Sequence, residues 1–245
     1  MVFPSSNGYN SYQDRDNTSI GGMKYPPQVT RNLFYVTLLF DLVALFTALL
    51  ISPLFAFLIF VFIVMSRLYS FRGIRIKKYP FAAFFTVFIF QGAFVYLMTS
   101  VAVSPLTANG AFTVRQLICM LISSLFIGSM YPLTQIYQHE ADRRDGVISI
   151  SYLLGFRGTF IFAGILFAAA SALLFYYFGI SNQYVALLLF PVLVSPVVVF
   201  LYRWFGKVVK NSRHANFENT MKANMLSATC MNAFFLLVIV SNRLI

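Results

Sequence analysis

The sequence predicts an all-α protein, a polytopic transmembrane helix bundle with about seven spans, and two observations carry this prediction. Of its 245 residues, 59% are hydrophobic, 18% are aromatic and only 10% are charged, whereas a soluble domain carries about 25% charged residues. Seven apolar runs are also long enough to cross a hydrocarbon core about 30 Å thick, which takes roughly 20 helical residues. We therefore expect one integral membrane domain over residues 1–245.

The apolar runs follow one another with short polar connections. Pro53 and Pro80 stand where runs begin, the position at which a missing amide hydrogen costs least. Pro132, Pro191 and Pro196 fall inside runs, where we expect kinks. The runs lie near residues 32–50, 53–70, 80–101, 113–135, 157–180, 183–204 and 220–241.

Lysine and arginine gather in alternate connections. The segment before the first run holds three, the loop at 67–78 five, the loop at 136–157 three and the loop at 203–222 five, which places 16 of the 18 on one side. Loops that retain Lys and Arg are cytoplasmic, so the N-terminus is expected inside, most simply at a bacterial inner membrane. The net charge of +11 then reflects topology and contact with lipid headgroups. Neither nucleic acid nor an obligate protein partner is predicted.

The acidic residues indicate a site. Five of the seven fall in two clusters on the predicted cytoplasmic side, NGYNSYQDRDNTSIGG at 7–22 and YQHEADRRDG at 137–146. In each cluster an amide precedes a carboxylate by four residues, which on a helix places both on one face. Two such oxygen-rich faces opposite one another would bind Mg²⁺, although loops are also simply where charges are tolerated. The candidate ligands are Asn10, Asp14 and Asp16 in the first cluster and Gln138, Glu140 and Asp142 in the second.

A basic loop, RLYSFRGIRIKKYP at 67–80, lies on the same predicted side. Its cations could hold a diphosphate, and they could equally be the orientation signal alone. Together with the acids, they suggest a reaction in which a diphosphate leaves under metal stabilisation while a lipid tail stays in the bilayer. Aromatic faces could stabilise the allylic cation left behind. The candidate cations are Arg72, Arg75, Lys77 and Lys78.

Three stretches resemble, in order, motifs of the UbiA superfamily of membrane-bound polyprenyl prenyltransferases. NGYNSYQDRDNT resembles the first aspartate-rich motif, roughly N-D-x-x-D-R-x-x-D, and LYSFRGIRIKKYP is similar to the Y-S-x-P-x-x-x-K stretch. YQHEADRRDGVISISYLLG resembles the second motif, D-x-E-G-D-R-x-x-G-x-x-T-L…L-G. The residues in register with that second motif are Glu140, Asp142, Arg143, Gly146, Leu154 and Gly155.

The resemblance implies Mg²⁺-dependent transfer of a prenyl group from a polyprenyl diphosphate to an acceptor, an aromatic ring as in quinone biosynthesis. Asp14 and Asp142 would be the catalytic residues, and the six oxygen-bearing residues of the two clusters would hold the metal. The diphosphate-binding residues would be Arg72, Arg75, Lys77, Lys78 and Arg143. The resemblance also implies nine spans, whereas this sequence has seven, and its first motif begins near Met1. We therefore expect it to lack the family's first span and most of its second.

Two other functions compete with a prenyltransferase. Asp41 stands inside the first run, where an unpaired charge costs at least about 2.5 kcal/mol, and it either lines the acceptor cavity or pairs with a polar neighbour. A transporter that uses Asp41 and Gln91 along a pathway is one rival. The other is a degenerate, non-catalytic relative, because Ser11, Thr18 and Gln138 stand where the family motifs have aspartates.

Overall fold

The computed structural model describes residues 1–15, 19–103 and 113–244, and every regular element within them is helical. The predicted all-α class is confirmed. The elements are α1 (Val2–Asp14), α2 (Arg31–Ile51), α3 (Pro53–Ser70), α4 (Pro80–Val87), a π-helical segment (Phe88–Ala93), α5 (Phe94–Val103), α6 (Val114–Gln135), α7 (His139–Arg144), α8 (Ile150–Ile180), α9 (Tyr184–Lys210) and α10 (Phe217–Leu244), with short 3₁₀ turns at Ile76–Lys78 and Ser212–His214.

Seven helical stretches within the described residues are long and apolar enough to cross a membrane. The stretch Pro80–Val103 combines α4, the π-helical segment and α5, and the other six are α2, α3, α6, α8, α9 and α10. Each coincides with one of the runs predicted from the sequence. The largest differences in their ends are at α8, which begins already at Ile150, and at α9, which continues to Lys210. The chain is therefore an integral, multi-pass membrane protein.

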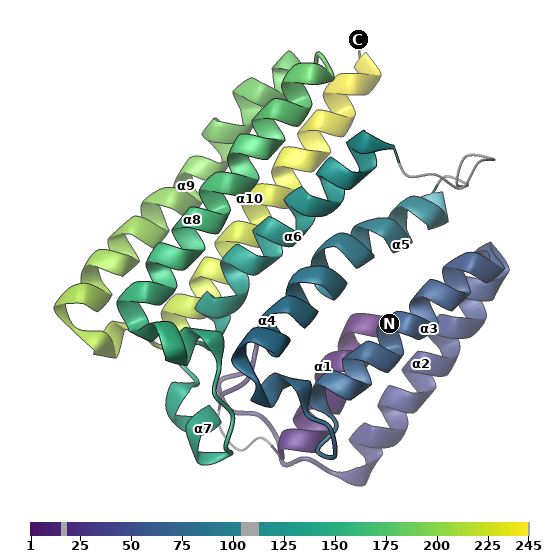
Figure 1. Cartoon of the computed structure of the whole chain (residues 1–245), viewed down its shortest axis with the longest axis vertical. Coiled ribbons are helices and arrows are strands. Elements are labelled where there is room, and N and C mark those ends of the chain that lie inside the picture. The colour runs from purple at the N-terminus through teal and green to yellow at the C-terminus, as the bar shows by residue number, and fades with distance from the viewer. Residues whose placement is uncertain (16–18, 104–112, 245) are drawn as a thin grey trace.

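The helices pack in two groups (Figure 1). α2 and α3 lie on one side with α1 beside them, α6 and α8 to α10 lie on the other, and the stretch from α4 to α5 runs between. One apolar core joins α2, α3 and α5 around Phe62. Another joins α6, α8, α9 and α10 around Phe234, whose side chain is fully buried. Apolar side chains that face outward are common in both groups, as a lipid environment allows.

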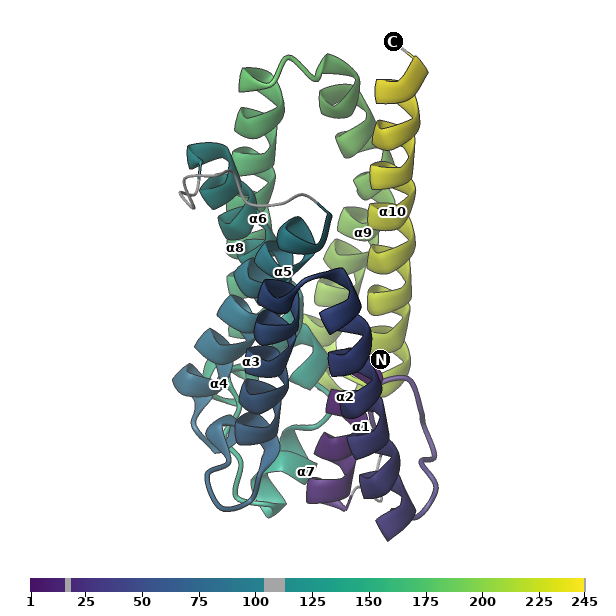
Figure 2. The same cartoon turned by 90° about the vertical axis from the view of Figure 1, so that its right-hand side faces the viewer.

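The connections rich in Lys and Arg share one end of the bundle, the lower end in Figure 1. The end of α1, the α3–α4 loop, α7 and the α9–α10 loop come together there, and Figure 2 shows α1 and α7 at the same end from a second direction. An ion pair between Lys24 and Glu218 ties the segment before α2 to the first turn of α10. The charge count therefore predicted correctly which connections lie together.

The prolines behave as their positions predict at the helix starts. Pro53 and Pro80 occupy the first turn of α3 and α4. α6 continues through Pro132, and α9 continues through Pro191 and Pro196. Proline at the first helical position keeps every intrahelical hydrogen bond, because the amide hydrogen there has no partner in any helix.

Two glycines mark departures from regular α-helix. A Cβ added to Gly92, in the π-helical segment, would lie 2.3 Å from Ser124 Cα on α6. The Ser124 hydroxyl accepts a hydrogen bond from the Ala93 amide at 2.9 Å, so the two backbones are in direct contact. Gly155, inside α8, has φ 64° and ψ 174°, a conformation that essentially only glycine adopts. The first turn of α8 therefore points away from the rest of the helix.

A buried ion pair fastens α1 to α2 and α3. Asp41 on α2 is 7% exposed and pairs with Arg67 in the last turn of α3. Ser5 of α1 donates to Asp41 Oδ1 at 2.6 Å, and Arg67 donates to Ser5 Oγ at 3.1 Å and to Thr37 Oγ1 at 3.2 Å. The guanidinium carbon also lies 4.0 Å from the centroid of the Tyr9 ring. Asp41 is thus paired with polar neighbours. Arg67, assigned from the sequence to the loop at 67–78, lies in the last turn of α3.

Candidate functional site

Two adjoining cavities open among α1, the α3–α4 loop and α7, at the basic end of the bundle. The larger has a volume of about 540 Å³ and the smaller about 260 Å³. The first and second sequence clusters, more than a hundred residues apart, contribute to both. We call the two cavities together the polar site. The residues that line both cavities are Asp14, Lys77, Tyr137, Gln138, Asp142 and Val147.

Asp14 ends α1 inside the polar site, where 13% of its side chain is exposed. Its Oδ2 atom is ion-paired with Lys77, and its Oδ1 atom lies 3.3 Å from Arg75 Nη2. Lys77 Nζ also donates to Asn10 Oδ1 at 2.9 Å, and the same oxygen accepts a hydrogen bond from Ser70 Oγ at 2.8 Å. Asn10 and Asp14 therefore face one lysine, as their four-residue spacing on a helix predicts.

The α3–α4 loop carries its cations into the site through a sharp turn. Arg75 has φ 52° and ψ 60° and precedes the 3₁₀ turn Ile76–Lys78. Its guanidinium is ion-paired with Asp145 and donates to the Asp145 carbonyl at 3.2 Å. Burial alone would lower the pKa of Arg75. The hydrogen bond and charge of Asp145, together with the charge of Asp14, raise this pKa by more than burial lowers it, so the net shift is upward. Within the described residues, the buried Nε of Arg75 has no hydrogen-bond partner.

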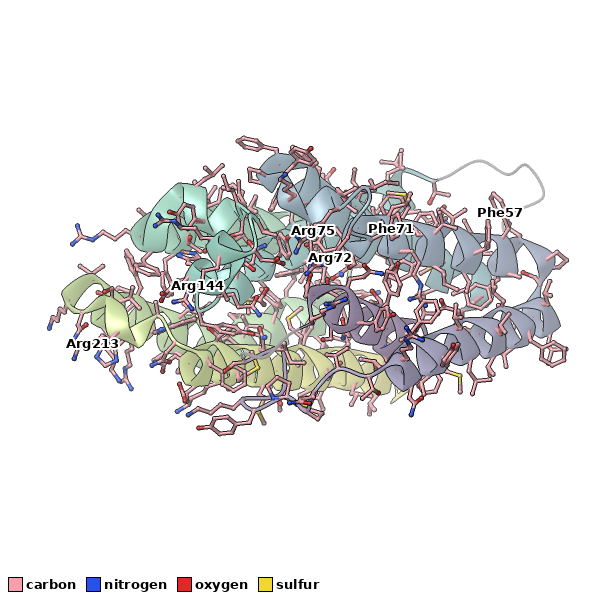
Figure 3. All side chains as sticks on the ribbon, turned by 90° about the horizontal axis from the view of Figure 1, so that it is seen from below. Phe57, Phe71, Arg72, Arg75, Arg144 and Arg213 are labelled. Carbon is pink, nitrogen blue, oxygen red and sulfur yellow. The ribbon has the colours of Figure 1, made fainter. Side chains whose placement is uncertain are left out.

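Asp145 anchors a second arginine at the rim of the site. Arg72 Nη2 lies 3.7 Å from Asp145 Oδ1, and Arg72 Nε donates to the carbonyl of Gln13 on α1 at 2.6 Å. Figure 3, which looks onto the basic end, shows Arg72 and Arg75 next to each other, with Arg213 at the far edge. The α3–α4 loop therefore connects α1 with the end of α7 through arginines.

The second cluster is positioned by packing against α8. The His139 ring, at the start of α7, stacks on Phe156 with ring centroids 5.0 Å apart and planes 9° apart. It also shares a hydrogen bond with the buried hydroxyl of Ser151 at 2.8 Å. Burial lowers the pKa of His139 to about 4. The ring is therefore neutral at neutral pH. Its stacking on Phe156 and its hydrogen bond with Ser151 hold α7 against α8.

The structure brings together most of the predicted metal ligands. Glu140 lines only the larger cavity, and its side chain, 81% exposed, is ion-paired with Arg144. Asp16 and Thr18 lie outside the described residues. The four predicted ligands that line the smaller cavity are Asn10, Asp14, Gln138 and Asp142.

The predicted diphosphate-binding residues divide into two sets. Arg75 and Lys77 line the larger cavity, with side chains 11% and 10% exposed. Arg72 is exposed at the rim, where it contacts Gln13 and Asp145 as described above and its Nη2 also donates to the Asp14 carbonyl at 3.5 Å. Lys78 and Arg143 are exposed and line neither cavity. Of the five, Arg75 and Lys77 are thus placed to meet a ligand directly.

Sequence reasoning missed three residues of the site. Asp145 holds both arginines of the loop, and its position three residues after Asp142, one helical turn on, was the available signal. Tyr69 and Tyr131 line the smaller cavity, and their hydroxyls share a hydrogen bond at 2.7 Å. Nothing in the sequence pairs these two tyrosines, because their contact depends on how α3 and α6 are rotated.

The oxygen donors of the smaller cavity suit a hard cation. They include the carboxylates of Asp14 and Asp142 and the side-chain amides of Asn10 and Gln138, and Mg²⁺ typically takes one or two carboxylates and leaves its other positions for water and phosphate. The described residues contain no group of three or more His, Cys, Asp or Glu side chains that could hold a metal ion by themselves. The donor set therefore fits Mg²⁺ that is bound together with a phosphate ligand.

Comparison with known proteins agrees with this chemistry. The UbiA prenyltransferase family matches residues 1–226. A solved structure reported for digeranylgeranylglyceryl phosphate synthase is similar in fold, with a TM-score of 0.56 and 19% identity over 98% of this chain and 81% of that one. No curated protein sequence matches the chain. Because the family match spans most of its length, this protein belongs to the UbiA prenyltransferase family, and is a membrane-embedded prenyltransferase that uses a polyprenyl diphosphate.

Proposed function

We propose that the chain transfers a prenyl group from a polyprenyl diphosphate to an aromatic acceptor, that the reaction depends on Mg²⁺, and that it takes place at the cytoplasmic face of a bacterial inner membrane. One observation carries the proposal. Asp14 on α1 and Asp142 on α7 line the same polar site as Lys77 and Arg75. Carboxylates for a metal and cations for a diphosphate thus meet at one end of an apolar bundle.

Lys77 and Arg75 would bind and orient the diphosphate. The planar guanidinium matches two phosphate oxygens at once, and the buried Nε of Arg75 is a donor without a partner in the described residues. When the bond between the first prenyl carbon and the diphosphate oxygen breaks, negative charge develops on that oxygen. Fixed cations beside it stabilise this charge more than they stabilise the intact substrate. Arg72, Lys78 and Arg143 remain proposed contacts at longer range.

Asp14 and Asp142 would hold Mg²⁺, with Asn10, Gln138 and Glu140 as further oxygen donors. Asp16 stays a predicted ligand. When bound, the ion acts as a Lewis acid that neutralises charge on the diphosphate. The positioning of the carboxylates comes from the helices, because α1 is fastened by the Arg67 ion pair and α7 by the His139 ring.

Aromatic side chains support the proposal of an aromatic acceptor. Tyr69, Tyr131 and Tyr137 line the smaller cavity beside the carboxylates. Aromatic rings pack favourably on one another in offset or edge-on arrangements, and their faces attract a developing allylic cation. The acceptor and the reacting end of the prenyl chain would therefore meet beside these rings, away from bulk water.

The transporter interpretation loses Asp41, one of the two residues that motivated it. Asp41 is paired with Arg67 and accepts a hydrogen bond from Ser5, so its burial is explained without a transport pathway. The non-catalytic alternative rests only on residues such as Ser11 and Gln138, which depart from the family motifs. It shares the fold and predicts no turnover, which an assay distinguishes.

The test is an assay in membranes that carry the whole chain. Labelled prenyl diphosphates and a panel of aromatic and lipid-alcohol acceptors are supplied with Mg²⁺ or with a chelator, and extracted products are separated by chromatography. We expect a product that the chelator abolishes and that Asp14→Asn and Asp142→Asn both lose. Glu218→Gln is the matched carboxylate control, since this exposed residue pairs with Lys24 on the same end of the bundle. Absence of any chelator-sensitive product would favour the non-catalytic relative.

The membrane side needs a separate measurement. Arg144 is exposed on α7 at the rim of the larger cavity, so a cysteine placed there by Arg144→Cys marks the face of the site. In intact cells, a thiol reagent that cannot cross membranes should leave this cysteine unlabelled, and it should label the cysteine in inside-out vesicles. Labelling in intact cells would place the site on the outer face.

A further inference from the structure

Both carboxylate oxygens of Asp14 already have cationic partners in this structure. Oδ2 is ion-paired with Lys77, and Oδ1 lies 3.3 Å from Arg75 Nη2. Lys77 also donates to Asn10, the other predicted metal ligand on α1. The two cations thus sit on the oxygens that a metal ion would use.

These ion pairs are shielded from water. The exposed fraction of the side chain is 13% for Asp14, 11% for Arg75 and 10% for Lys77. In such a setting Coulomb interactions are weakly screened, and removing one partner leaves the other as an uncompensated charge. A divalent cation arriving alone must therefore displace Lys77 and Arg75 from Asp14, and it would leave three cationic groups close together.

A diphosphate removes this conflict because it offers the displaced cations a new partner. Lys77 carries three donors on a flexible stem, and Arg75 has a buried Nε donor that no described residue uses. Arg75 would not leave the site on losing Asp14, because Asp145 holds the same guanidinium through its side chain and its carbonyl. Phosphate oxygens can also complete the coordination of Mg²⁺.

We propose that Lys77 and Arg75 are exchangeable counter-ions of Asp14, so that Mg²⁺ and a diphosphate bind the polar site as a linked pair and each raises the affinity for the other. Asp145 is then a positioning residue that keeps Arg75 at the mouth during the exchange. The inference rests on the proposed function, and it goes further by stating that free Mg²⁺ is a poor ligand and the metal–diphosphate complex a good one. Linkage requires the two affinity changes to be equal.

The experiment measures binding, with no turnover. The full chain in lipid nanodiscs is titrated calorimetrically with Mg²⁺ alone, with inorganic pyrophosphate alone, and with Mg²⁺ in the presence of pyrophosphate. Each titration is corrected with a protein-free titration for the complex that forms in solution. We expect pyrophosphate to raise the Mg²⁺ affinity of the unmodified chain by about tenfold or more, within the usual range for coupled sites.

Variants then assign the coupling to the counter-ions. Lys77→Met removes one cation from Asp14, so Mg²⁺ alone should bind more tightly than in the unmodified chain, pyrophosphate alone more weakly, and the coupling should shrink. Lys77→Gln serves if the first variant does not fold, and the comparison in the unmodified chain needs no variant. Lys24→Met is the control, because it removes the same charge from the exposed Lys24–Glu218 pair and should leave the coupling unchanged.

The outcomes separate this inference from the proposed function. If the metal–pyrophosphate complex binds but Mg²⁺ affinity is the same with and without pyrophosphate, the linkage is wrong and the proposed function stands. If coupling is present but Lys77→Met and Lys77→Gln bind Mg²⁺ alone no more tightly than the unmodified chain, Lys77 is not the counter-ion. If neither Mg²⁺ nor its pyrophosphate complex binds at all, both the proposed function and the linkage fail.

Discussion

Arg67 on α3 and Asp41 on α2 form a buried ion pair that also binds Ser5 of α1. The pair therefore joins three helices at once, and one of these helices ends at Asp14 inside the polar site. Charges taken out of water are tolerated only when every group is paired. The position of the first motif thus depends on an interaction within the bundle and on the apolar contacts around it.

Removing one partner of this pair should strongly destabilise the protein. Arg67→Leu leaves Asp41 as an unpaired buried charge, and we expect the free energy of unfolding to fall by about 3–5 kcal/mol. Changing both residues to leucine removes both charges and should recover a large part of that loss. Thermal unfolding in detergent, followed by circular dichroism, measures both variants. Equal destabilisation in the single and double variants would show that the charge pairing is not the cause.

Within the second motif, Asp142 should matter far more than Glu140. Asp142 lines both cavities, whereas Glu140 is largely exposed and pairs with Arg144. We expect Asp142→Asn to lower the rate of prenyl transfer by about 100-fold or more, as loss of a charge-stabilising group at a reaction centre does, and Glu140→Gln to lower it about threefold at most. The measurement is kcat at saturating diphosphate. Comparable losses would show that Glu140 contributes to the metal site as much as Asp142 does.

Acid should loosen α7 through His139. Burial lowers the pKa of His139 to about 4 from its ordinary value of 6.5. Between these two values the unfolded chain binds a proton that the folded chain does not, so stability is fully present above about pH 6.5 and falls as the pH drops toward about 4. His139→Phe keeps a ring beside Phe156 and does not titrate.

The unfolding midpoint of the unmodified chain should therefore fall more steeply with acid than that of His139→Phe, and only within this pH window. Hydrogen exchange of the α7 amides gives a local measurement of the same effect. Parallel pH profiles for the two proteins would mean that other groups control the acid response.

Gly92 should not tolerate a side chain. A Cβ there would lie 2.3 Å from a backbone atom of Ser124, which cannot rotate away as a side chain could. We expect Gly92→Ala to cost about 1–3 kcal/mol of unfolding free energy, as overpacking does, because α6 and the π-helical segment must separate. Gly164→Ala is the control, since nothing lies within 4 Å of its added Cβ and alanine favours a helix by about 1 kcal/mol. Similar melting temperatures for both variants would contradict the close contact.

The sequence predicts the helices well because the membrane imposes a minimum length on each apolar run. All seven expected spans are present, and the charge pattern identifies which connections share an end. The Arg67–Asp41 pair could not be predicted, because it depends on the rotation of α2 against α3. The π-helical segment depends likewise on the contact between Gly92 and Ser124, which is a property of two helices and not of one stretch of sequence.

The candidate site was predictable in part. Four-residue spacing places Asn10 with Asp14 on a helix face, and the motif order brings Asp142 to the same end. The directions of the loop cations were not predictable, because the left-handed turn at Arg75 sends Lys77 inward and leaves Lys78 exposed. Nothing in the local pattern of KK distinguishes the two lysines.

The contacts of α1 also have a consequence for the order in which the newly made protein assembles. Docking of α1 through Ser5, Asp41 and Arg67 needs no residue beyond 67, whereas the polar site needs Asp142. Translation at about 5–20 residues per second separates these events by roughly 4–15 s. We expect α1 to dock on α2 and α3 during that interval, whereas the partners of Asp14 itself, Arg75 and Lys77, follow in the next loop. The second motif would thus meet a helix that already carries the first.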